Sequence, residues 1–292
     1  MSARSRAQFA DVVRQTPIDL ALACQLIAAE VEPDAEAADV PGALDRLADE
    51  ARPVLAAKTS RATAAGATPG ACAQEPPAGQ DPIDAAEALH ESLGLHAGFA
   101  GRESDYDDLR ASLLPAVLRR RHGLPITLSV IWLEVASRLG VPAYPVGLPG
   151  HMVVALGTPR EYVLVDPFTG GRRITVHDAA ARVRAAGVPF SRAQLAPMSS
   201  EDLLARVLGN IRVLAARSDA TATRLWAVEL SLLLPHHPAS LRRERGELLI
   251  RRGDFLRGAI DLVTFADAVE VAEPAAAAAA RSAAISARAR LN

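Results

Sequence analysis

Apolar residues recur at helical spacing from residue 4 to residue 57 and predict three helices. Two turn-forming pairs interrupt the pattern, at Pro33-Asp34 and Pro41-Gly42. We therefore assign residues 1–57 to a helical N-terminal lead-in. Residues 58–82 (KTSRATAAGATPGACAQEPPAGQDP) are small, polar and rich in Pro and Gly, with almost nothing to bury. They predict a long flexible loop or linker that is mobile and dispensable.

Residues 83–198 mix helical and strand patterns. A helix over Ile83–Leu93 is followed by a loop, GFAGRESDYDDLRASLL, that leads into a helix ending near His122. The next helix, Pro125–Leu139, is apolar nearly all round, which predicts a central and buried position. Short strands are predicted at Tyr144–Val146, His151–Leu156, Tyr162–Val165 and Arg173–Val176.

Residues 199–292 return to a helical pattern, with turns at Pro235, Pro238 and Gly253-Asp254. The region is expected to form helical hairpins, and a run of six alanines near the end predicts a last, frayed helix. The chain as a whole is therefore expected to be α+β. A central buried helix would pack on a small antiparallel sheet, with helices before and after it.

Composition removes several classes of function. Half of the 292 residues are apolar, which indicates a globular protein, and the net charge of −2 gives no reason to expect nucleic acid or an anionic membrane. Cys24 and Cys72 are too few for a disulfide framework and lack zinc-site spacing. No apolar run is long enough to span a membrane. We expect a cytoplasmic protein with no metal and no cofactor.

The stretch from Leu148 to Phe168 predicts a hairpin that brings together a base and a carboxylate. If its loop is Gly157–Arg160, Leu156 pairs with Glu161 and His151 lies opposite Asp166. The two side chains would then be hydrogen-bonded on neighbouring strands and would face the start of the helix Pro125–Leu139. The plain alternative is a buried structural pair with no chemistry of its own.

Two longer segments carry a resemblance to a known family. The texts RRHGLPITLSVIWLEVASRLGVPAYPVGLPGHMVV and YVLVDPFTGGRRI resemble the bacterial SirB-type branch of the transglutaminase-like, papain-related superfamily. The segment HPASLRRERGELLIRRGDFLRGAIDL resembles a tetratricopeptide unit. The resemblance implies a transglutaminase-like core over 83–198, followed by tetratricopeptide-like helices over 199–292.

The resemblance also implies a set of site residues. In active members of the superfamily a cysteine at the start of the central helix is the nucleophile, a histidine takes its proton and an aspartate orients the histidine. His151 and Asp166 match the last two positions, and the cysteine position falls on Pro125. Proline offers no nucleophile, so the resemblance implies the fold more strongly than it implies a reaction.

Ser129 is the best substitute hydroxyl, because it lies about one turn past Pro125 on the same helix face. The alternative is that Ser129 and Thr127 bond the carbonyls of the preceding turn. Gly150, next to His151, either lets the backbone pass close to a ligand or only permits the turn.

The loop that holds Glu103, Asp105, Asp107 and Asp108 lacks the bidentate glutamate of a calcium loop, so a solvated loop with a helix cap is expected. Tyr106 and Asp107 match the SirB-type lead-in, which implies that they line the rim of a cleft.

Three functions are compatible with the sequence. In the first, the protein is transglutaminase-like and binds a peptide or small ligand in the cleft beside His151. Alternatively, it is an adaptor whose C-terminal helices hold a protein partner, or an acyl-transfer or amide hydrolase that uses Ser129 or an activated water.

Overall fold

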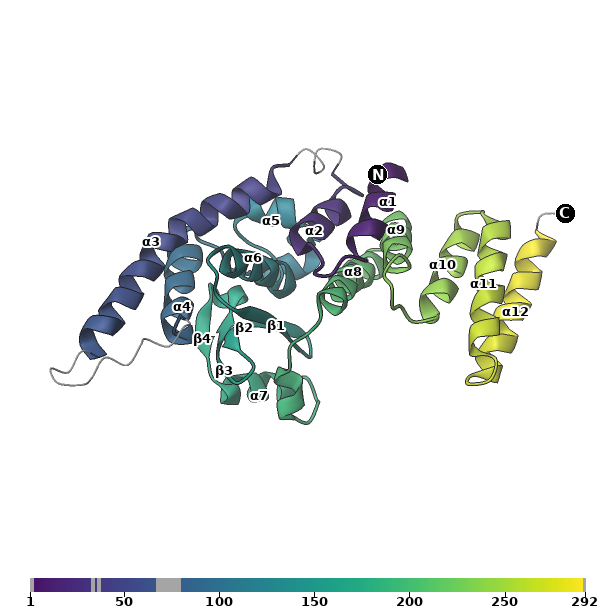
Figure 1. Ribbon diagram of the computed structural model, residues 1–292. Helices are drawn as coiled ribbons and strands as arrows, with labels where there is room; N and C mark the ends of the chain where they lie inside the picture. The colour runs from purple at the N-terminus through teal and green to yellow at the C-terminus, as the bar shows by residue number, and fades with distance from the viewer. Residues whose placement is uncertain (1–2, 33–34, 36–37, 67–79, 291–292) are drawn as a thin grey trace. The chain divides into compact units, whose positions relative to one another are not determined.

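The computed structural model describes residues 3–32, 35, 38–66 and 80–290, and Figure 1 shows their path. The chain divides into two compact units. Residues 20–203 form one, and residues 1–19 with 204–292 form the other. Within the described ranges, each helix is too short or too polar to cross a membrane. The unit 20–203 contains the sheet and every candidate site residue.

Helices surround the sheet of the unit 20–203, as the sequence predicts. They are α2 (Leu20–Ala28), α3 (Val40–Gly66), α4 (Pro82–Leu89), α5 (Leu114–Arg120), α6 (Pro125–Arg138) and α7 (Val176–Ala185). A π-helical turn, His90–His96, extends α4, and 3-10 turns occupy Glu103–Asp107, Leu109–Ser112, Pro167–Thr169 and Arg192–Leu195. Of these helices, α6 confirms the predicted central helix, since nearly all of its residues are buried. The observed fold is α+β, as expected.

The predicted linker 58–82 is wrong at its beginning, because α3 continues to Gly66. The Lys58 ammonium explains the extension: it lies 3.6 Å from the carboxylate of Glu87 and 3.0 Å from that of Glu91, which hold α3 beside α4 and the turn after it. The run is also rich in alanine, the strongest helix former. The rest of the predicted linker, with Cys72, falls largely on 67–79, outside the described residues.

Four antiparallel strands form the sheet in the order β1-β2-β3-β4. They are β1 (Ala143–Leu148), β2 (His151–Thr158), β3 (Glu161–Asp166) and β4 (Arg172–Ile174). All four strands were predicted, with shorter bounds for the first three. The predicted fourth strand ran to Val176, but that residue begins α7, a helix that the strand pattern did not indicate.

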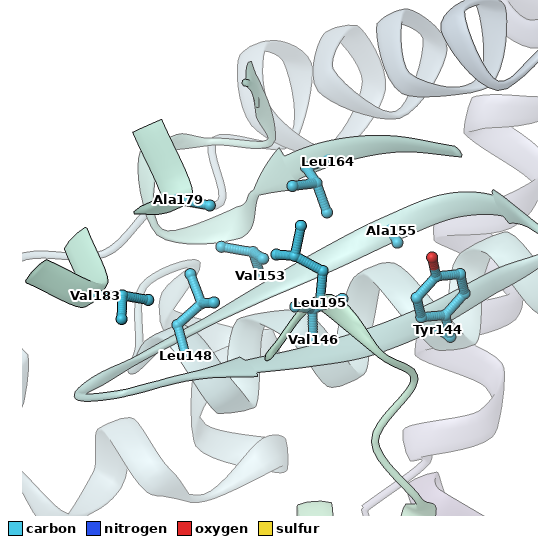
Figure 2. Close-up of a cluster of buried hydrophobic side chains, with 9 residues drawn as sticks. All are labelled: Tyr144, Val146, Leu148, Val153, Ala155, Leu164, Ala179, Val183 and Leu195. Atoms are coloured by element: carbon cyan, nitrogen blue, oxygen red, sulfur yellow. The ribbon is translucent and has the colours of Figure 1, made fainter. Parts of the chain in front are cut away.

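Both faces of the sheet are covered. Alternate residues of the strands meet two side chains of α7 and Leu195 in one buried cluster, which Figure 2 shows. Its members are Tyr144, Val146, Leu148, Val153, Ala155, Leu164, Ala179, Val183 and Leu195. The intervening residues of β2 are buried too, and α6 contacts β1 and β2. Because successive side chains of a strand point to opposite faces, α6 covers the face opposite to α7.

The predicted hairpin register is wrong by two residues. Leu156 pairs with Val163 instead of Glu161, and Thr158 pairs with Glu161, so only Pro159 and Arg160 form the turn. Gly157 and Thr158 read as loop residues, but they continue β2. A shift of two residues keeps every side chain on its face, whereas a shift of one would reverse them all.

The other unit is helical. It contains α1 (Ala3–Val12), α9 (Thr221–Ser231), α10 (Ser240–Arg251), α11 (Phe255–Val269), α12 (Pro274–Ala289) and most of α8 (Ser200–Arg217). The sequence placed α1 in the lead-in, and the structure corrects this assignment. Arg6 of α1 pairs with Glu229 of α9 at 2.6 Å. The predicted helical hairpins are confirmed, since α10, α11 and α12 pack in succession.

The last helix of that unit packs on α11 through a stripe of alanines, and Arg281 adds exposed ion pairs to Asp267 and Glu270. Its buried residues are Ala277, Ala280, Ala284 and Ala287, which lie against α11 in one cluster. This stripe gives a close but thin contact, because each side chain contributes a single methyl group.

Candidate functional site

His151 and Asp166 form the buried polar pair of the sheet. His151 opens β2 and Asp166 closes β3, and the imidazole Nε2 lies 3.0 Å from a carboxylate oxygen. The exposed fraction is 8% for His151 and 0% for Asp166. The observed register shifts Asp166 by two residues from its predicted position, so the two side chains lie diagonally across neighbouring strands and not directly opposite each other. The predicted hydrogen bond between them is nevertheless confirmed.

The pair lies on the face that α7 covers. Leu148 of the buried cluster is directly opposite His151, and Asp166 follows Leu164 of the same cluster by two residues. Meanwhile α6 contacts β2 and the Pro167–Thr169 turn that follows Asp166. By side-chain parity the pair points away from α6, so the predicted orientation of the pair toward the first turn of α6 is not supported.

The Asp166 carboxylate accepts three hydrogen bonds. Oδ1 accepts from His151 Nε2 and from the backbone N–H of Phe168, both at 3.0 Å, and Oδ2 accepts from Arg182 Nη2 at 2.7 Å. A buried carboxylate without such donors would be strongly destabilising. The carboxylate is therefore fixed in position by two strands, a turn and a helix.

Arg182 is the residue that the sequence reasoning missed. It lies on α7, which Thr175 starts: the Thr175 hydroxyl accepts from the Asp178 N–H at 3.1 Å, and the Asp178 carboxylate accepts from the Thr175 N–H at 2.8 Å. This capping box, followed by Ala179 and Val183 at helical spacing, is the sequence signal that predicts α7.

Arg182 also lies close to the His151 ring. Its Nη1 lies 3.3 Å from His151 Nε2, the same nitrogen that lies 3.0 Å from Asp166. A neutral imidazole nitrogen is either a donor or an acceptor, and guanidinium only donates. The shorter contact, to a charged acceptor, makes Nε2 the donor to Asp166.

Two aromatic rings extend the site outward. The Phe168 ring lies 6.0 Å from the His151 ring and 5.8 Å from the Tyr106 ring, centroid to centroid. Tyr106 is 42% exposed. Burial raises the pKa of the Tyr106 hydroxyl, the Asp166 charge raises it further, and Arg182 lowers it in part. Tyr106 therefore presents a neutral hydroxyl beside the pair at neutral pH.

A second histidine–carboxylate pair fixes the turn that carries Tyr106. His122 Nδ1 lies 2.7 Å from Asp105, and the other Asp105 oxygen accepts the Arg102 N–H at 2.9 Å. The expected solvated acidic loop is wrong at this residue, since Asp105 is buried. Asp107, next to Tyr106, is exposed.

The α6 candidates have different surroundings. Pro125 is the first residue of α6, and the Ser129 hydroxyl, fully buried, donates to the Pro125 carbonyl at 2.8 Å. This hydrogen bond is the structural role expected for Ser129 as the alternative to a nucleophile. The Thr127 hydroxyl is buried and finds no hydrogen-bond partner among the residues that the structure describes, so the same expectation is wrong for Thr127. Gly150 adopts φ +69° in the β1–β2 turn, with nothing within 4 Å of an added Cβ, which supports its turn role.

Two protein-family models match the chain and confirm a transglutaminase-like region followed by tetratricopeptide-like helices. The sequence model of the transglutaminase-like superfamily matches residues 38–209, more than half of the chain, and a tetratricopeptide-repeat model matches residues 211–290. The chain therefore belongs to the transglutaminase-like superfamily and continues into tetratricopeptide-like helices.

Among individual proteins, the chain is 36% identical over 173 residues to a UPF0162 protein of Xylella fastidiosa, covering 57% of this chain and 61% of that protein. A UPF0162 protein of Pasteurella multocida is 26% identical over 64% of the chain and 73% of its own length. F-box only protein 21 of Mus musculus is 30% identical over 52% of the chain and 25% of its own length. No solved structure matches. The bacterial relatives agree with the SirB-type resemblance.

Proposed function

We propose that this protein is a transglutaminase-like protein without the cysteine nucleophile, which binds a peptide or small ligand beside His151 and Asp166. The observation that carries the proposal is the intact pair: a buried imidazole and carboxylate 3.0 Å apart. Tyr106, which is exposed and contacts the pair through the Phe168 ring, supplies a neutral hydroxyl that a ligand can reach.

Pro125 supports the loss of the cysteine chemistry. A thiol at a helix N-terminus has a lowered pKa because the helix dipole stabilises the thiolate. Pro125 occupies the first position of α6 and has neither a thiol nor a backbone N–H. We expect no cysteine-type transglutaminase or protease activity, and we expect thiol-alkylating reagents to leave ligand binding unchanged.

Binding is tested by titrating 15N-labelled protein with a panel of tripeptides, in free-acid and amidated forms, while following the imidazole resonances. The His151→Ala variant should lose the response to binding peptides and keep its fold. His177→Ala is the matched control, because His177 is an exposed histidine of α7, and it should respond as the unsubstituted protein does. A panel without any saturable response, or an undiminished response in His151→Ala, refutes the proposal.

The ancestral geometry is tested separately by Pro125→Cys. α6 covers the other face of the sheet, so its first turn can reach His151 only past the end of the strands. If it does, the new thiolate is stabilised by the imidazolium and the helix dipole, and alkylation at neutral pH should be faster than for a free cysteine. The double variant Pro125→Cys with His151→Ala is the control and should alkylate at the slower rate. A normally titrating thiol in Pro125→Cys would show that helix and pair do not face each other.

A hydrolase that uses Ser129 is less well supported, because its hydroxyl is fully buried and bonded to Pro125. If it were the nucleophile, Ser129→Ala would abolish hydrolysis of activated esters. We expect no difference from the unsubstituted protein. An activated water on His151 would instead make hydrolysis depend on His151 alone.

The tetratricopeptide match favours a second function, an adaptor for a protein partner. Leu256 and Ile260, one turn apart on α11, are both about half exposed, which makes them candidate contact residues. A photo-crosslinker at position 260 should capture a partner that Leu256→Asp no longer binds. Val271→Asp, at an exposed residue outside α11, is the control and should leave capture unchanged. We also propose the cytoplasm as the compartment, as expected for a chain with two cysteines.

A further inference from the structure

Arg182 has hydrogen-bonding capacity that the His151–Asp166 pair does not use. Its Nη1 and Nη2 both approach the pair, at 3.3 Å from His151 and 2.7 Å from Asp166, so the end of the guanidinium faces inward. The side edge, formed by Nε–H and the second hydrogen of Nη2, contacts no acceptor among the described residues. Because a guanidinium carries five donors in a fixed fork, this edge can bind a second planar group.

The surroundings of that edge are rich in donors and poor in acceptors. Asp166 is fully buried, and its oxygens already accept three hydrogen bonds on the inner side. The Arg182 side chain is 37% exposed, and Tyr106 keeps a neutral hydroxyl that can donate. The nearest acid along α7, Asp178, is committed to the Thr175 amide and hydroxyl.

We propose that the ligand of this site carries a carboxylate, which the Nε/Nη2 edge of Arg182 binds in a bidentate manner and the Tyr106 hydroxyl supports. The inference rests on the proposed ligand-binding function and names its substrate class. A carboxylate fits because its two oxygens match the spacing of the guanidinium edge. A cationic ligand is disfavoured, because it would meet the Arg182 charge while the Asp166 carboxylate is fully buried beneath it.

The probes are N-acetylglycine and its uncharged counterpart N-acetylglycinamide, with inorganic phosphate as a competing oxyanion. Arginine-15N-labelled protein reports directly on the Nε–H of Arg182, whose resonance is assigned by its loss in Arg182→Gln. N-acetylglycine should shift this resonance saturably and the amide should not. Affinity for the acid should fall at least about tenfold in Arg182→Gln and several-fold in Tyr106→Phe.

The matched control is Arg184→Gln. Arg184 is an exposed arginine of the same helix, two residues away, without a described contact to the pair, so its loss should leave affinity within about twofold. If Arg182→Gln does not fold, Arg182→Lys, which keeps a cation beside Asp166 but has no Nε–H fork, assigns the resonance by the same loss and should also weaken binding of the acid. The Tyr106→Phe variant is a second, independent measurement.

Three outcomes overturn the inference while leaving the binding function intact. They are equal binding of acid and amide, both lost in His151→Ala; tighter binding of phosphate than of the carboxylate; and binding of the acid that survives in Arg182→Gln. A fourth outcome, no response to either probe or to any tripeptide of the panel, removes both proposals.

Discussion

Replacing Asp166 with asparagine measures how much the His151–Asp166 pair contributes to the free energy of unfolding of the unit 20–203. The substitution keeps the shape but exchanges one oxygen for an amino group, so that a donor faces either Arg182 Nη2 or the donors of His151 and Phe168. Breaking one side of a buried ion pair typically costs about 3–5 kcal/mol. Arg182 is 37% exposed and regains water, which reduces the loss. We expect Asp166→Asn to lower the free energy of unfolding by about 2–3 kcal/mol.

The two tryptophans allow the units to be followed separately. Trp132 is fully buried in the unit 20–203, and Trp226 belongs to the helical unit. In a Trp226→Phe background, fluorescence during urea unfolding reports on Trp132 alone. With a slope of about 2 kcal/mol per molar urea, Asp166→Asn should lower the midpoint by about 1 M or more.

The control is Asp49→Asn, the same chemical change at an exposed residue. Asp49 and Arg52 lie 3.6 Å apart, and each side chain is more than half exposed, so their pair contributes little. The control should stay within about 0.5 kcal/mol of the unsubstituted protein. If Asp166→Asn shifted the midpoint no more than Asp49→Asn does, the carboxylate would not connect the strands with α7. The role of Arg182 as its partner would then be refuted as well.

Three other perturbations have defined outcomes. Burial raises the pKa of Tyr144 to about 12 from a usual value of 10.0. The neutral hydroxyl therefore stabilises the fold fully below pH 10, and this stabilisation is lost as the pH rises toward about 12. In Tyr144→Phe the free energy of unfolding should fall less over that alkaline range. Gly171→Ala should be more destabilising than Gly187→Ala by about 1–3 kcal/mol, because both glycines have positive φ but only an added Cβ at 171 would lie 2.7 Å from the Trp132 ring. Thr175→Ala should lower the free energy of unfolding by about 1 kcal/mol by removing the cap of α7, and equal stability would contradict the capping box.

The sequence was informative wherever one strong pattern decided the structure. The helix that begins at Pro125 is apolar on every side, so its burial follows from composition alone. The strands around His151 and Asp166 show the same clarity, since each is a short, valine-containing apolar run between turns. The hydrogen bond of the pair was predictable because face parity survives a register error of two residues.

The errors arose where local composition and tertiary contact disagree. Gly157 and Thr158 have turn chemistry, yet they extend β2. Residues beyond 57 read as linker, but Lys58 is held by two carboxylates that are distant in sequence, and no local pattern records such a contact. Arg182 could be placed beside Asp166 only by knowing that α7 folds back over the sheet.

The alanine stripe of α12 sets the order in which the helical unit opens. Alanine loses no rotamer freedom when it is buried, so docking this helix costs little side-chain entropy. A single methyl group per turn also buries little apolar surface, and the solvent-exposed ion pairs of Arg281 add little, so undocking has a small free-energy cost. Amide protons of α12 should therefore exchange with solvent long before those of α10 and α11, and the terminal helix acts as a separate, low-stability step on a more persistent helical pair.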